Sequence, residues 1–260
     1  MYGVDSLGSC DDLTFERSYN VLHDVVVSKR LDGFNLDTEV RGEVVNAEDE
    51  RMSLQAINRL IDRLNTEFGS NFIIVMTASA EALLSTDGNQ KSTEIDYRAL
   101  ETQRGHLISW YNVRIFSPYE RSGGHTNEIR LPRTLKGFRV GGGPDEQRDP
   151  ASNFVRELNL YIRLLQHGVY RADKILMAVS TTPNACDGTV RGHGPYIDSL
   201  RLRGILELLR WSYSPVAFGG VAGWEYSPVR GSTTVGHPGG SRSPWLWAKE
   251  TRAILESVFL

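Results

Sequence analysis

Two acidic side chains, Asp37 and Glu39, lie two residues apart in a segment that alternates apolar and polar residues. Successive side chains of a β-strand point to opposite faces, so both carboxyl groups are expected on one face, with Phe34 and Leu36 on the other. At 3.3 Å per residue, their Cα atoms would lie about 6.6 Å apart. A strand of this kind fits the wall of a barrel whose interior opens into an active site, where carboxyl groups act as acids and bases. The pattern equally fits an amphipathic edge strand with solvated acids.

Asp32, Gly33, Asn35, Asp37 and Glu39 form the pattern D-G-x-[DN]-x-[DN]-x-E. This pattern resembles the signature of family 18 glycoside hydrolases, the chitinases and endo-β-N-acetylglucosaminidases. The resemblance implies that Glu39 is the general acid and that Asp37 orients the acetamido group of the substrate. It also implies a retaining, substrate-assisted mechanism, in which the N-acetyl oxygen attacks the anomeric carbon. Most members have an aspartate in place of Asn35, so proton sharing with Asp37 is lost here and a changed pH profile is expected.

The resemblance extends to a group of fungal and bacterial members of the family. The similar stretches are residues 15–17, 52–54, 59–64, 72–74, 96–101, 110–112 and 219–226. Trp224, in the last of them, matches the aromatic floor of a sugar subsite in the family, and an aromatic ring suits the flat apolar face of a sugar. The alternative for Trp224 is a core tryptophan.

One stretch departs from the family pattern. Members of this group usually read W-Y-N-x-Q-F-Y, where this chain has W-Y-N-V-R-I-F, and strand parity puts Asn112, Arg114 and Phe116 on one face. Phe116 lacks the tyrosine hydroxyl that helps to hold the acetamide, and losing such a hydrogen bond slows a reaction by about two to three powers of ten. If Arg114 points inward, it would pair with Asp37 or Glu39, and a pair with Glu39 would keep the general acid ionised. The substrate-binding residues implied by the resemblance are Asp32, Asn35, Asn112, Arg114, Phe116 and Trp224.

Strands and helices alternate along the chain, which predicts a parallel sheet built from βαβ units. Apolar spacing predicts helices at 12–29, 54–68, 97–104, 151–166, 197–211 and 245–258, and strands at 31–39, 72–78, 107–116, 174–180 and 217–226. The fold class is α/β, of the (β/α)8 TIM-barrel type. The family signature lies on the fourth barrel strand, so the chain as written corresponds to about strands 4–8 of a barrel truncated at its N-terminus.

Residues 1–260 are therefore predicted to form a single partial catalytic domain. Two segments are too long for ordinary connections, and we interpret residues 40–52 and 117–150 as loop insertions. Both follow strands, which places them on the rim of the barrel, where loops carry specificity. The alternative is translated non-coding sequence in a faulty gene model.

Composition limits the classes of partner. A net charge of -3 does not indicate binding to nucleic acid or to an anionic membrane. No apolar run reaches the roughly 18 residues of a membrane span, and the first twelve residues lack the features of a secretion signal. Cys10 and Cys186 are expected as free thiols, and the six histidines form no ligand-spaced cluster, so neither a metal nor another cofactor is expected. Compartment and oligomeric state are not predicted.

The predicted function is cleavage of β-1,4 bonds next to N-acetylglucosamine, in chitin or in oligosaccharides that contain this sugar. The sequence does not separate chitin from the N-glycan core as the substrate. Two alternatives stay open. Arg114 and Phe116 motivate a non-hydrolytic chitin-oligosaccharide binder. The missing strands motivate an inactive truncated product, because an open barrel exposes unpaired edges.

Overall fold

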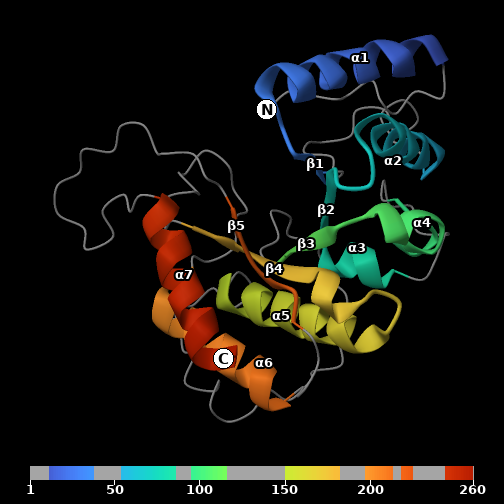
Figure 1. Ribbon diagram of the computed structural model, residues 1–260. Coiled ribbons are helices and arrows are strands. Elements are labelled where there is room, and N and C mark those ends of the chain that lie inside the picture. Colours follow the sequence, from blue (N-terminus) through green and yellow to red (C-terminus); the bar gives the residue numbers. More distant parts are fainter. Residues whose placement is uncertain are drawn as a thin grey trace.

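The computed structural model describes residues 12–37, 54–85, 95–115, 150–181, 197–212, 218–224 and 244–259. Within these ranges, five parallel strands form one sheet (Figure 1). Each strand pairs with the next one along the chain, in the order β1-β2-β3-β4-β5. The direction of winding never reverses, as in the wall of a (β/α)8 barrel, whereas a doubly wound sheet reverses at its switch point.

Short strands alternate with longer helices. The strands are β1 (Gly33–Asp37), β2 (Ile73–Ser79), β3 (Trp110–Arg114), β4 (Ile175–Ser180) and β5 (Gly220–Trp224). The helices are α1 (Asp12–Lys29), α2 (Leu54–Phe68), α3 (Ala80–Leu84), α4 (Tyr97–Arg104), α5 (Pro150–His167), α6 (Ser199–Ser212) and α7 (Pro244–Phe259), with 3₁₀ turns at Gly105–Leu107 and Ala172–Lys174. In Figure 1, α1 and α2 lie near β1 and β2, and α7 lies at the other side of the molecule beside α6.

The pairing register between strands, together with the alternation of side chains along each strand, assigns the strand residues to two faces of different polarity. One face packs against the helices and is apolar and buried; it carries Leu36, Ile74, Met76, Ala78, Tyr111, Val113, Ile175, Met177 and Val179. The other face carries the polar residues Asn35, Asp37, Thr77, Ser79, Asn112, Arg114 and Ser180. In a barrel, the face away from the helices is the interior. We therefore call this polar side the interior face.

The predicted order of elements is confirmed, with one omission. All five strands and all six predicted helices are present, each within a few residues of its predicted bounds. No helix is predicted between residues 78 and 97, but α3 begins directly after β2, because the Ser79 side chain accepts a hydrogen bond from the backbone N–H of Ala82. Residues 40–52 and 117–149 of the two long segments lie outside the described residues. None of the described helices has both the length and the apolar character needed to cross a membrane.

Candidate active site

Asp37 is the last residue of β1, at the carboxyl end of the strand. The register places it opposite Thr77 of β2, and it places Thr77 opposite Asn112 of β3. The three side chains therefore share the interior face and form one polar row across three strands. The carboxyl ends of parallel strands are where barrel enzymes assemble their active sites. This row is the candidate active site.

A close approach of two backbones positions β1. A Cβ atom on Gly33 would lie 2.4 Å from the carbonyl oxygen of Ile73, so the pairing with β2 requires glycine at the first residue of the strand. Leu36 is 2% exposed and packs in the core. Because side chains alternate along a strand, burying Leu36 on the helix side turns Asp37 to the interior face.

Thr77 supports the row from the central strand. Its side chain is fully buried, and its Oγ1 donates a 2.9 Å hydrogen bond to Oδ1 of Asn35. The bond orients the amide two residues before Asp37. Thr77 is missing from the residues singled out in the sequence. The available signal is a pair of hydroxyl side chains, Thr77 and Ser79, at the carboxyl end of a strand whose other residues are apolar.

Arg114 closes the row from β3. Its Nη2 lies 3.4 Å from Oδ1 of Asp37, and the two side chains are 2% and 15% exposed. The register places Arg114 opposite Ser79 of β2, so the guanidinium group reaches across that strand to the carboxyl group on β1. Of the two pairings expected from the sequence, the one with Asp37 is present. An arginine beside a carboxylate favours the ionised form of the acid.

Tyr111 anchors β3 from the helix side. Its hydroxyl donates a 2.6 Å hydrogen bond to Oε2 of Glu101 on α4. Burial and this hydrogen bond raise the pKa of Tyr111 far above its ordinary value, so the hydroxyl stays protonated and keeps donating. The ring of Tyr170 packs edge-on against Tyr111, with centroids 5.2 Å apart. Since Tyr111 is fixed on the helix side, its neighbour Asn112 is held on the interior face.

Asn112 is half-buried and has an acceptor to offer. Its Oδ1 is buried, and no hydrogen bond to this atom is found among the described residues. A buried acceptor without a donor is unfavourable, by about 1–3 kcal/mol. A sugar hydroxyl or an amide N–H of a ligand would satisfy it.

The other predicted site residues are placed less completely. Glu39 and Phe116 lie outside the described residues, and only the backbone of Trp224 is described, at the carboxyl end of β5 opposite Ser180. Asp32 is exposed at the opposite end of β1, five residues and about 16 Å of strand away from Asp37. The structure therefore does not bring Asp32 to the row. In the described part of the chain, no three metal-ligating side chains gather in one place.

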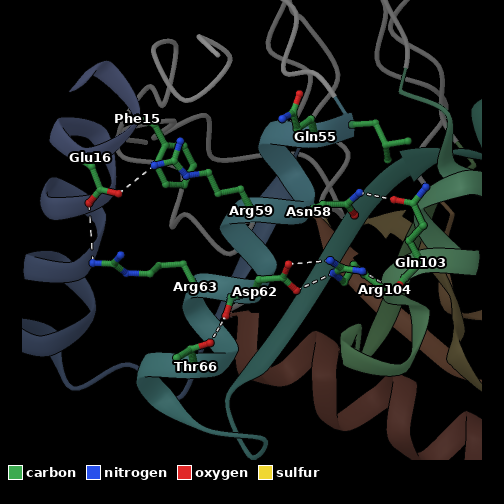
Figure 2. Close-up of a pocket in the computed structure, with 11 residues that line it drawn as sticks. Phe15, Glu16, Gln55, Asn58, Arg59, Asp62, Arg63, Thr66, Gln103 and Arg104 are labelled. Carbon is green, nitrogen blue, oxygen red and sulfur yellow. Dashed lines mark hydrogen bonds and ion pairs between the residues drawn. The ribbon is translucent and has the colours of Figure 1, made fainter. Parts of the chain in front are cut away.

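A groove of about 950 Å³ lies elsewhere, between helices α1, α2 and α4 (Figure 2). Helix residues alone line it. Arg59 pairs with Glu16 across α2 and α1, and Arg104 donates two hydrogen bonds to Asp62 across α4 and α2. These charges tie neighbouring helices together, and the groove is on the outer side of the sheet. We assign it a structural role.

Comparisons with known proteins identify the fold. No protein-family model and no curated protein matches the chain, but solved structures do. One is a fungal endo-β-N-acetylglucosaminidase from glycosyl hydrolase family 18, with a TM-score of 0.62 and 27% identity over 99% of this chain and 68% of that chain. Another is a chitinase from Aspergillus fumigatus, with a TM-score of 0.56 and 30% identity over 97% of this chain and 68% of that chain. A family 18 chitinase from Pseudoalteromonas aurantia, 15% identical with a TM-score of 0.55, covers 92% of this chain and 66% of its own and agrees in fold.

The fold and these likenesses define the class: the chain has the fold of chitinase-like glycoside hydrolases, which is a (β/α)8 barrel. The five-stranded sheet corresponds to part of the barrel, and the predicted fold class is confirmed. The chain belongs to glycoside hydrolase family 18. It spans 68% of the length of each of the first two relatives.

Proposed function

We propose that this protein is a glycosidase that cleaves β-1,4 linkages next to N-acetylglucosamine, in chitin or in oligosaccharides that contain this sugar. The observation that carries the proposal is the position of Asp37. Asp37 is the last residue of the strand that bears the family signature, and its side chain lies on the interior face of the sheet. There its carboxyl group belongs to the polar row at the carboxyl ends of the strands. The two relatives described above, an endo-β-N-acetylglucosaminidase and a chitinase, support the choice of substrate class.

In the proposed reaction, Glu39 and Asp37 divide the work. Glu39 gives a proton to the leaving glycosidic oxygen. Asp37 accepts a hydrogen bond from the acetamide N–H and turns the acetamido oxygen towards the anomeric carbon. The bond to the leaving oxygen breaks as the bond to the acetamido oxygen forms, which gives an oxazolinium ion. Water then attacks the anomeric carbon and gives a proton back to Glu39, while the bond to the acetamido oxygen breaks and restores the acetamido group. The configuration is thus inverted twice and retained overall.

The charge of Asp37 suits the second part of its role. The oxazolinium ion carries a positive charge, and a carboxylate already fixed beside it stabilises that charge without reorganisation. Thr77 and Asn35 fix the neighbouring part of β1 through their 2.9 Å hydrogen bond. We further propose that Asn112 accepts a hydrogen bond from the sugar and that Trp224 forms an apolar floor beneath it.

A matched pair of substrates tests the proposal. Fluorogenic chitobioside and cellobioside differ at C2, where one has an acetamido group and the other a hydroxyl group. Because the acetamido oxygen is the proposed nucleophile, we expect hydrolysis of the chitobioside and not of the cellobioside, with the β-anomer appearing first in ¹H NMR spectra. Equal cleavage of both substrates, or an inverted first product, would contradict the proposed mechanism.

Replacing the acid is the accompanying control. Glu39→Gln keeps the shape of the side chain and removes the proton donor, so we expect turnover to fall by a factor of about 10² to 10⁴. Binding of a chitooligosaccharide, measured by calorimetry, should persist in this variant. A folded variant that turns over at the wild-type rate would remove Glu39 from the proposed role.

A further inference from the structure

The ion pair between Arg114 and Asp37 lies at the centre of the proposed site. We propose that Arg114 is a positioning residue that holds Asp37 in its ionised form and thereby shifts the working range of the enzyme to lower pH. This inference rests on the proposed function, because it describes how the site would be tuned. The observation that carries it is the ion pair on the interior face between Arg114 of β3 and Asp37 of β1, two strands that lie on either side of β2.

Burial makes the pair effective. The Arg114 side chain is 2% exposed and Asp37 is 15% exposed, and their nearest charged atoms are 3.4 Å apart. Water screens such a pair less than it screens an exposed pair, so each charge acts strongly on the protonation of its neighbour. A buried guanidinium group stays charged throughout the pH range in which carboxyl groups titrate.

Residues on the helix side of the sheet fix the strands that carry both partners of the ion pair. Leu36, next to Asp37, is buried in the core, and Tyr111, three residues before Arg114, is tied to Glu101 on α4. These anchors keep the two strands in place, so the pair follows from the fold and not from a chance meeting of surface side chains.

The described strand residues around this pair on the interior face are uncharged. Among the described strand residues on that face, Asp37 and Arg114 are the only ones with ionisable side chains. β2 contributes Val75, Thr77 and Ser79, β4 contributes Leu176, Ala178 and Ser180, and β5 contributes Gly220 and Ala222. Glu39 lies outside the described residues, and the alternation in the sequence predicts it on the same face.

The direction of the effect follows from the charge. A positive group stabilises the ionised form of any carboxyl group near it, so it lowers the pH at which that carboxyl group titrates. Asp37 must be ionised in the proposed reaction and sets the acidic limb of the rate profile; Glu39 must be protonated and sets the basic limb. Arg114 therefore moves both limbs to lower pH. Neutralising Arg114 should move both limbs to higher pH.

The test compares kcat and kcat/KM across the pH range for the wild type, Arg114→Lys and Arg114→Gln. In Arg114→Gln we expect the acidic limb to move to higher pH by about one unit or more. This is the lower end of the pKa shift that an adjacent arginine produces in an aspartate. Arg114→Lys retains the charge, so both limbs of its profile should stay near their wild-type pH values even if the rate itself falls. A merely structural role would change the height of the profile in both variants and leave its position unchanged.

A second readout does not depend on activity. ¹³C NMR of aspartate-labelled protein, with Asp37→Asn used to assign the signal, follows the titration of Asp37 directly. We expect Asp37 to titrate at higher pH in Arg114→Gln than in the wild type. An unchanged titration, or an unchanged pH profile in the folded variant, would overturn the inference. A wild type without turnover but with a shifted Asp37 titration would overturn the proposed function and leave the ion pair standing.

Discussion

Removal of the Asp37 charge should destabilise the protein, because the change takes away the carboxylate that lies 3.4 Å from the buried guanidinium group of Arg114. Asp37→Asn preserves the size and shape of the side chain and removes only the negative charge. The 3.4 Å contact makes this substitution a direct test of the ion pair.

The magnitude follows from the distance. Two unit charges 3.4 Å apart in an effective dielectric constant of about 20 attract each other by about 5 kcal/mol. Breaking one partner of a buried pair costs about 3–5 kcal/mol in measured cases. Because Asp37 keeps 15% of its side chain exposed, water compensates part of the loss, and we expect about 3 kcal/mol. In a domain of this size, that corresponds to a fall in Tm of about 6–12 °C.

Urea unfolding at pH 7, followed by circular dichroism, measures the loss. The set comprises the wild type, Asp37→Asn, Arg114→Met and the double variant. The double variant removes both charges, and we expect its free energy of unfolding to lie within about 1 kcal/mol of the wild-type value. The double variant should thus be more stable than Asp37→Asn, with a clear coupling energy between the two sites. If Asp37→Asn unfolds at the wild-type midpoint, the ion pair contributes nothing and the reasoning is refuted.

Three further changes test how the fold positions the site. Gly33→Ala places a Cβ atom 2.4 Å from a carbonyl oxygen of β2 and should lower the free energy of unfolding in urea by about 1–3 kcal/mol. The control is Gly204→Ala on an exposed part of α6, where a Cβ atom meets no atom within 4 Å, and this change should be neutral or stabilising. Equal effects of the two changes would contradict the close approach of the strands. Tyr111→Phe removes a buried hydrogen bond to a carboxylate and should lower the free energy of unfolding by about 1.5–3 kcal/mol, and an unchanged value would show that the hydroxyl is not engaged. The pKa of Glu67 is lowered from its usual 4.5, chiefly by the hydrogen bond from the hydroxyl of Tyr19, so the stabilisation by ionised Glu67 is complete above pH 4.5 and is lost as the pH falls through the pKa of the folded state. Tyr19→Phe should therefore make the unfolding midpoint less dependent on pH between 3 and 5. An unchanged pH dependence would remove Tyr19 as the cause.

The sequence predicts the strand that carries Asp37 because two patterns agree there. Alternation of period two assigns Leu36 to the core and Asp37 to the other face, and both assignments are confirmed. Gly33 is recognised in the sequence as part of a signature, and its physical reason, a backbone approach to β2, appears only in the structure.

Other features depend on register, which periodicity does not specify. Nothing local to β1 or β3 shows that Asp37, Thr77 and Asn112 form one row, because their alignment is set by packing between strands that are far apart in sequence. Thr77 is missed for this reason, and Arg114 is left with two possible partners. The short helix α3 is missed because its start depends on one hydrogen bond from the side chain of Ser79.

The most direct measurement of the central claim is hydrolysis of a fluorogenic chitotrioside by the purified 260-residue chain between pH 4 and pH 8, with Glu39→Gln alongside. Cooperative thermal melting of both proteins confirms that they are folded. We predict turnover by the wild type that is lost in Glu39→Gln. A soluble, cooperatively melting wild type that binds the chitotrioside without cleaving it would contradict the assignment as a glycosidase.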